Sequence, residues 1–113
     1  IGEVVASPFC RTVDTGRLIA GTATVDAELF FAIALPNAEK RRKGTALRAL
    51  MARAPAAGMN RVIIGHTANL MEAVGLWPKP EGVAYVFQAD AQGRIVPLAR
   101  IEPDTWKAAG FQQ

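Results

Sequence analysis

The chain has 113 residues, of which half are hydrophobic and a fifth are charged, and its formal net charge is +3. This length allows one domain with a modest core, so we expect residues 1–113 to form a single domain. The composition is that of a globular protein and excludes a disordered chain. No apolar run approaches the roughly 20 residues that a membrane-spanning helix needs, so we expect no membrane association.

Cysteine and histidine each occur once, as Cys10 and His66. One cysteine excludes an internal disulfide framework, and this pair cannot supply the ligands of a Cys/His zinc site within one chain. A single cysteine is compatible with the cytoplasm and with the periplasm, so the compartment stays open. The first residues form no secretory signal and include no initiator methionine, which indicates a processed or cut piece of a longer chain.

Five of the thirteen basic residues fall within one short stretch, with Glu39 beside them. The stretch contains no aromatic side chain that could stack on a base. We therefore interpret it as the solvated face of a helix and expect no nucleic-acid partner. The five residues are Lys40, Arg41, Arg42, Lys43 and Arg48.

The predicted elements begin with a short, buried strand at residues 3–6. Ser7 is a good N-cap and Pro8 suits the first position of a helix, which we expect to continue to Ile19. Gly21 is the predicted C-cap of this helix. The chain therefore opens with a strand that leads directly into a helix.

Residues 22–35 are β-prone and irregular, and Asn37 is placed to cap the helix that follows them. That helix, at residues 38–54, is the clearest of the chain because apolar residues recur at helical spacing among lysines and arginines. Gly44 weakens it by about 1 kcal/mol relative to alanine. The core candidates from these two segments are Val25, Leu29, Phe30, Phe31, Ile33, Leu47, Leu50, Met51 and Ala54.

The β-branched run at residues 60–64 predicts a central parallel strand, followed by a turn and a short helix at 69–74. Residues 82–87 and 94–100 predict a hairpin with its turn at 90–93, and Pro97 places the second strand at a sheet edge. A last short helix begins at Pro103. This order of elements predicts an α/β fold in which helices pack on a mixed sheet.

Two of the predicted strand-to-helix turns hold polar residues that could bind a ligand. In the first, the N–H groups of the helix start, the hydroxyl of Ser7 and the guanidinium of Arg11 together suit a phosphate or a carboxylate. In the second, His66 follows an apolar strand. Ligands of open α/β sheets bind outside the carboxyl ends of the strands, so both turns are candidate binding positions.

The two turns together resemble a known family. Residues 7–15 are similar to the S-P-x-x-R-x-x-x-T segment of the histidine phosphatases, the phosphoglycerate-mutase-like superfamily, and residues 62–66 are similar to its later V-x-V-G-H segment. The tail, at residues 80–82 and 103–106, resembles a bacterial branch of the family, so the resemblance covers essentially the whole chain. It implies a three-layer α/β sandwich with a mostly parallel mixed sheet and a C-terminal hairpin.

The resemblance also implies a function. In this family two arginines and two histidines hold the phosphoryl group, and Arg11 and His66 match the second arginine and the second histidine. These bind phosphoryl oxygens and stabilise the charge of the transition state. We expect Ser7 and Thr67 to complete the phosphate site. The implied activity is hydrolysis of a phosphorylated small molecule or a phosphoprotein, through a phosphohistidine intermediate and with no metal or cofactor.

The chain departs from the family pattern because it contains no R-H-G motif, whose histidine is the nucleophile. We therefore expect a partial domain, truncated at its N-terminus and inactive by itself, within a parent that is a phosphatase. The strands at 3–6 and 60–64 should both lie near the missing first strand. An unpaired edge there would favour self-association or association with the missing N-terminal segment.

The general acid is a second departure. Many family members place a glutamate shortly after a D-x-x-L segment, which residues 26–29 resemble, but phenylalanines stand where that glutamate would follow. Glu28 and Glu81 are the candidate replacements, and we expect Trp77 and Trp106 to pack in the core or at its rim. The alternative function is a non-catalytic anion-binding or protein-interaction domain of the same fold.

Overall fold

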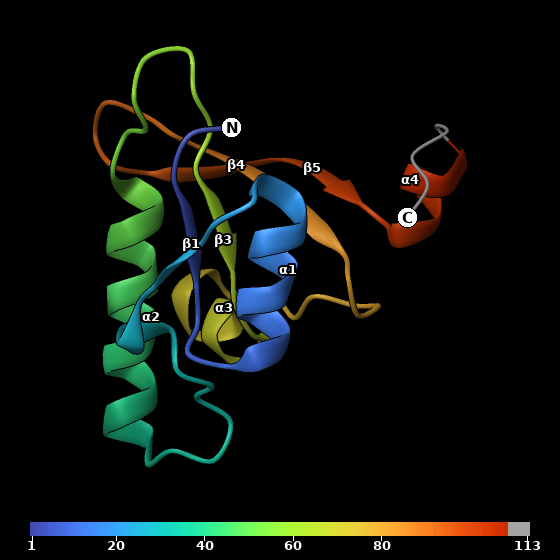
Figure 1. The fold of residues 1–113 in the computed structure, drawn as a ribbon. Coiled ribbons are helices and arrows are strands. Elements are labelled where there is room, and N and C mark those ends of the chain that lie inside the picture. Colours follow the sequence, from blue (N-terminus) through green and yellow to red (C-terminus); the bar gives the residue numbers. More distant parts are fainter. Residues whose placement is uncertain (109–113) are drawn as a thin grey trace.

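The computed structural model describes residues 1–108, and the side chains among them as far as Thr105. Strands and helices alternate along most of the chain, which ends in a hairpin and a short helix (Figure 1). The elements are β1 (Val4–Ala6), α1 (Cys10–Ala20), β2 (Thr24–Val25), the 3₁₀ helix η1 (Ala27–Leu29), α2 (Asn37–Ala52), β3 (Val62–Ile64), α3 (Thr67–Val74), β4 (Ala84–Ala89), β5 (Ile95–Ile101) and α4 (Pro103–Ala108). The α/β prediction is confirmed, with one parallel and one antiparallel sheet.

Three strands form the parallel sheet, in the order β2-β1-β3. Val5 of β1 lies opposite both Thr24 of β2 and Ile63 of β3. The connections through α1 and α2 supply the crossovers that parallel neighbours require. Because β1 has a partner on each side, it is β3 and not β1 that can border an open edge. Within residues 1–108, β3 pairs only with β1 and keeps one edge free.

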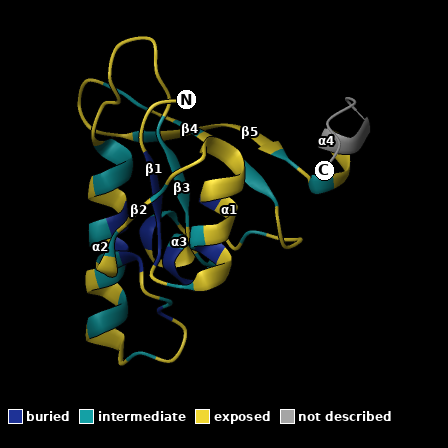
Figure 2. Cartoon of the chain, in the orientation of Figure 1, coloured by how far each residue is buried: buried dark blue, intermediate teal, exposed yellow. Residues whose placement is uncertain are grey.

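Helices pack against both faces of the parallel sheet, because successive side chains of a strand point to opposite faces. On one face Val5 packs with Leu29, Leu47 and Ala73 in the buried cluster beside α2 and α3. On the other face α1 approaches closely, since a Cβ on Gly16 would lie 3.3 Å from Val4. Figure 2 shows the buried residues gathered in β1 and around α3, so the core lies in the middle of the parallel sheet.

Helix α1 begins later than the sequence predicts. Its N-cap is Phe9 rather than Ser7, and its first residue is Cys10. The capping prediction for Ser7 is wrong because the hydroxyl of this residue is hydrogen-bonded to the side chains of Thr12 and His66. The residue that the sequence assigns to local helix capping therefore takes part in a tertiary contact.

The other helix ends differ from the prediction by one or two residues. Asn37 is the first residue of α2, whose N-cap is Pro36, and α2 ends at Ala52, which leaves Ala54 exposed beyond the helix. The C-cap prediction for α1 is confirmed: Gly21 has φ 80°, a left-handed conformation that glycine adopts at no steric cost. No helix within residues 1–108 is both long enough and apolar enough to cross a membrane.

The segment at residues 22–35 contributes less to the core than its composition predicts. Leu29 is buried and Phe31 is half-buried, but Val25, Phe30 and Ile33 are exposed, so these three core predictions are wrong. Strand β2 has only two residues and lies at the edge of the sheet, and Ala32 is the one buried residue of the loop at 30–36 that follows η1. Periodicity could not reveal which apolar residues such an irregular segment buries.

The predicted hairpin is present as the antiparallel pair β4 and β5, with its turn at residues 90–93. Pro97 of β5 lies opposite Phe87, and β4 is the only partner of β5 within residues 1–108, which places Pro97 in an edge strand. The hairpin passes behind the parallel sheet without pairing with it (Figure 1). The expected single mixed sheet is thus divided into two sheets. The packing expected of Trp106 lies outside the described side chains.

Candidate anion-binding site

The carboxyl ends of β1 and β3 lie side by side and position Ser7 and His66. Ala6 pairs with Ile64 at the end of the two strands, and the backbone N–H of Ser7 donates to the Ile64 carbonyl over 3.1 Å. Strand β1 then leads to α1, and β3 leads to α3, whose N-cap is His66. Ser7 and His66, which are 59 positions apart in sequence, therefore meet at one end of the sheet.

Arg11, in the first turn of α1, reaches the same place. Its Nη2 lies 3.4 Å from Nδ1 of His66, although 55 positions separate the two residues. On the other side of the imidazole, Nε2 of His66 lies 2.7 Å from Oγ of Ser7. Arg11 is exposed whereas Ser7 is fully buried, so the imidazole ring extends from the interior of the protein to its surface.

The hydrogen bonds around His66 define its tautomer. A guanidinium can only donate, so Nδ1 of His66 accepts from Arg11 and the neutral ring carries its proton on Nε2. Nε2–H then donates to Ser7 Oγ, and the Ser7 hydroxyl donates to Oγ1 of Thr12 over 2.8 Å. The Thr12 hydroxyl is 2.8 Å from the carbonyls of Ser7 and Phe9, to which it donates. This chain of donors runs in one direction and fixes the orientation of the imidazole.

Two phenylalanine rings enclose the imidazole. The ring of Phe31 stacks on His66 with 4.6 Å between centroids and an interplanar angle of 12°, and Phe9 meets it edge-on at 4.9 Å and 75°. The guanidinium carbon of Arg11 lies 5.5 Å from the Phe9 centroid and 5.8 Å from the Phe31 centroid. Such cation–π contacts contribute about 0.5–1 kcal/mol at exposed sites, so the rings help to hold Arg11 and His66 together.

The surroundings of His66 favour its neutral form. Burial, and secondarily the positive charge of Arg11, lower the pKa of His66 below its ordinary value. An anion placed between Arg11 and His66 would offset the guanidinium charge and accept a hydrogen bond from Nδ1–H of the imidazolium. The site therefore has the groups to couple anion binding to proton uptake by His66.

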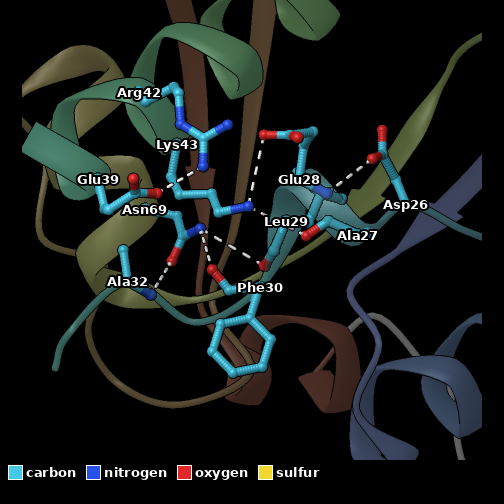
Figure 3. Close-up of polar contacts among 10 residues, drawn as sticks. All are labelled: Asp26, Ala27, Glu28, Leu29, Phe30, Ala32, Glu39, Arg42, Lys43 and Asn69. Carbon is cyan, nitrogen blue, oxygen red and sulfur yellow. Dashed lines mark hydrogen bonds and ion pairs between the residues drawn. The ribbon is translucent and has the colours of Figure 1, made fainter. Parts of the chain in front are cut away.

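Asn69 of α3 fixes the loop that carries Phe31. Its side-chain amide donates to the carbonyl of Phe30 over 2.9 Å, and its Oδ1 accepts from the backbone N–H of Ala32 over 3.0 Å (Figure 3). The side chain is almost fully buried, with 1% of the residue exposed. Phe30 and Ala32 are the residues before and after Phe31. Because Asn69 is hydrogen-bonded to the backbone of both, it restrains the position of Phe31 and holds this ring against His66.

A half-open cavity of about 1390 Å³ begins at these residues and continues between β3 and β4. Arg11, Phe31, His66 and Thr67 line its near end, and Thr67 is the first residue of α3. Glu81, in the loop before β4, lies on the wall of the same cavity. The anion-binding candidates therefore face a space that could admit a ligand.

The predictions for Trp77, Glu28 and Glu81 have different outcomes. Trp77 lies on the rim of the cavity with 43% of the residue exposed, as a rim residue would. Glu28 does not line the cavity, and its carboxylate instead lies 3.4 Å from Nζ of Lys43 on α2, as Figure 3 shows. The structure thus places Glu81 nearer to the candidate site than Glu28.

The structure brings Ser7, Arg11, His66 and Thr67 to one place, as expected from the two turns. Sequence reasoning missed the residues that support them: Thr12, Phe9, Phe31 and Asn69. Thr12 and Asn69 are polar residues within apolar helix faces. This pattern could have indicated that their side chains are buried and hydrogen-bonded. Nothing in the local pattern distinguishes Phe31 from its neighbours Phe30 and Ile33, both of which are exposed.

No protein-family model, curated protein or solved structure matches this chain. Among residues 1–108, no three His, Cys, Asp or Glu side chains form a group that could hold a metal ion.

Proposed function

We propose that this protein binds a phosphoryl group between Arg11 and His66, as half of the phosphate pocket of a histidine-phosphatase-type domain. The observation that carries the proposal is the approach of these two side chains, 3.4 Å apart, from neighbouring parallel strands. Their positions also agree with the two motifs that resemble this family. In this proposal the parallel sheet and its helices belong to a three-layer α/β sandwich, which the hairpin completes.

Each side chain has a distinct role in the proposed pocket. The guanidinium of Arg11 is exposed at the cavity and can bind two phosphoryl oxygens at once. His66, once protonated, donates from Nδ1 to a third oxygen while its Nε2–H remains bonded to Ser7. Ser7 is fully buried, so it contributes by orienting His66, and Thr67 offers a hydroxyl at the start of α3.

Hydrolysis through a phosphohistidine intermediate needs a second histidine. His66 is the only histidine of the 113 residues, and its Nε2 is bonded to Ser7. In the proposed parent phosphatase the nucleophile belongs to an R-H-G segment outside residues 1–113. The substrate is a phosphomonoester of a small molecule or a phosphoprotein, and residues 1–113 alone bind phosphate without cleaving the ester.

The alternative is a non-catalytic anion-binding or interaction domain of the same fold. The position of the carboxylates favours it, because Glu28 pairs with Lys43 and no hydrogen bond joins Glu81 to His66 or Arg11 among the described side chains. A phosphatase needs a proton donor for the leaving group. Discovery of an R-H-G segment in the parent sequence would favour the enzyme, and its absence would favour the binding domain.

Titration with inorganic phosphate, followed by isothermal calorimetry and by NMR of the His66 ring, tests the shared part of both functions. Arg11→Ala should weaken phosphate binding about tenfold or more, because a charge-assisted hydrogen bond contributes about 1.5–3 kcal/mol. Arg17→Ala is the matched control, since Arg17 lies on the same helix with 66% of its side chain exposed and faces Asp14. Equal binding by both variants would refute the proposed site.

A further inference from the structure

Among residues 1–108, one edge of β3 presents backbone groups that lack a strand partner. The N–H of Val62 donates to the Glu3 carbonyl over 2.9 Å, and the Ile64 carbonyl accepts from Ser7, so both residues face β1. Alternate residues of a strand direct their N–H and C=O groups to opposite edges. Ile63, between them, therefore points its N–H and C=O away from β1, toward the edge that has no partner within residues 1–108.

This edge borders the cavity of about 1390 Å³, and residues of β4 line the same cavity. Helices on the two faces of the sheet also line it: Ile19 of α1 on one face, and Leu47 of α2 and Leu70 of α3 on the other. The walls above and below the plane of the parallel sheet are mainly apolar, and a polar backbone edge runs along one side. A strand bound in this groove would therefore extend the sheet β2-β1-β3 beyond β3.

The shape and chemistry of the groove select an extended peptide. An apolar small molecule would leave the N–H and C=O of Ile63 without partners, which costs about 1–3 kcal/mol for each group that becomes buried. The β3 edge of a second copy lies within the same kind of groove, bordered by its own helices, so two such edges cannot meet. A single strand with free edges can enter, and β4, with six residues, sets a length of about 20 Å at roughly 3.3 Å per residue.

We propose that the groove between β3 and β4 is a docking site for one extended, apolar peptide segment from outside residues 1–113, which adds to β3 as the next strand of the sheet. The main-chain groups of Ile63 give affinity, and the apolar walls on both faces select Val- and Ile-rich side chains. This inference does not depend on the phosphatase activity, because it uses backbone hydrogen bonds and apolar walls and no residue of the anion site.

The test uses the whole 113-residue chain and a fluorescein-labelled probe peptide, acetyl-Lys-Val-Ile-Val-Ile-Val-Lys-amide. Its control peptide carries proline in place of the central valine, because proline lacks the N–H that strand pairing needs. Fluorescence anisotropy should show binding of the probe peptide and at least about tenfold weaker binding of the proline peptide. Amide exchange measured by NMR should slow at Ile63 on peptide addition, whereas the amide of Val62, already bonded to Glu3, should change little.

Two variants on neighbouring positions of α1 complete the test. Ile19→Glu places a charge on the groove wall and should weaken peptide binding about tenfold or more, since an apolar strand cannot solvate it. Leu18→Glu is the matched control, because Leu18 is 89% exposed and does not line the groove. Peptide binding that leaves exchange at Ile63 unchanged would overturn the proposal. So would a chain whose Ile63 amide is already protected by dimerisation and that binds no peptide.

Discussion

Oγ of Ser7 and Nε2 of His66 lie 2.7 Å apart and join the end of β1 to the start of α3. The bond matters for two reasons. It anchors the imidazole in the interior, since Ser7 has no exposed surface, and it leaves Nδ1 as the nitrogen that faces Arg11 and the cavity. Stability and anion binding are therefore linked through one hydroxyl.

Ser7→Ala should lower the free energy of unfolding by about 1–3 kcal/mol, because Nε2–H of His66 and Oγ1 of Thr12 lose their partner in a buried setting. Urea denaturation measures this change. Thr15→Ala is the control: its hydroxyl is exposed and bonds only to the Arg11 carbonyl of the same helix, so the change should stay within about 0.5 kcal/mol. An equal loss in both variants would contradict the role of Ser7.

Sulfate binding should strengthen as the pH falls from about 8 toward the pKa of His66. That pKa is lowered by burial and by Arg11, so the ring is neutral at high pH and must take up a proton to donate to the anion. One linked proton gives at most about tenfold in affinity per pH unit. Sulfate stays dianionic over this range, which isolates the titration of the protein. His66→Gln should bind sulfate with no pH dependence, and a flat profile for the unaltered chain would contradict the coupling.

Asn69→Ala should lower the free energy of unfolding by about 2–3 kcal/mol, because the carbonyl of Phe30 and the N–H of Ala32 lose buried partners. Release of this loop should also free Phe31 from His66, which NMR would detect as a shift of the imidazole resonances. Asn37→Ala, at an exposed position of α2, is the control and should change neither measurement. Unchanged imidazole resonances in Asn69→Ala would show that the loop does not depend on this residue.

Gly44→Ala should destabilise the protein by about 1–2 kcal/mol, although helix propensity alone predicts a gain of about 1 kcal/mol. A Cβ at this position would lie 2.7 Å from the Cβ of Glu72 and 2.8 Å from its carbonyl carbon, and backbone of α3 cannot move aside cheaply. Ala49→Gly, at an exposed position of the same helix, calibrates the propensity effect. A net gain in stability for Gly44→Ala would show that α2 and α3 pack less closely than the structure indicates.

The 113-residue chain should show no turnover of p-nitrophenyl phosphate above that of His66→Ala purified in the same way. The reason is that an arginine and a histidine that only bind charge cannot form the covalent intermediate. A steady-state absorbance assay of p-nitrophenol release by both proteins measures this difference. Turnover that disappears in His66→Ala would mean that His66 itself attacks the phosphorus, contrary to the proposed role.

Local patterns in the sequence were sufficient for most of the secondary structure. The strands β1 and β3, the helices and the hairpin all lie within a few residues of their predicted positions, because apolar periodicity and turn residues act over short distances. The same patterns failed for Val25, Phe30 and Ile33, which are apolar but exposed. Burial in an irregular segment depends on which elements pass over it, and periodicity does not encode that.

Local sequence patterns predict the alternation of strands and helices and the two turns that carry Arg11 and His66. The tertiary structure decided the rest: the order β2-β1-β3, which sets the two turns side by side, and the use of Ser7 as a partner of His66 instead of a helix cap. It also placed Phe31 on the imidazole and separated the hairpin from β3. The physical reason is that these contacts join residues tens of positions apart, whose approach depends on strand pairing and not on any local preference.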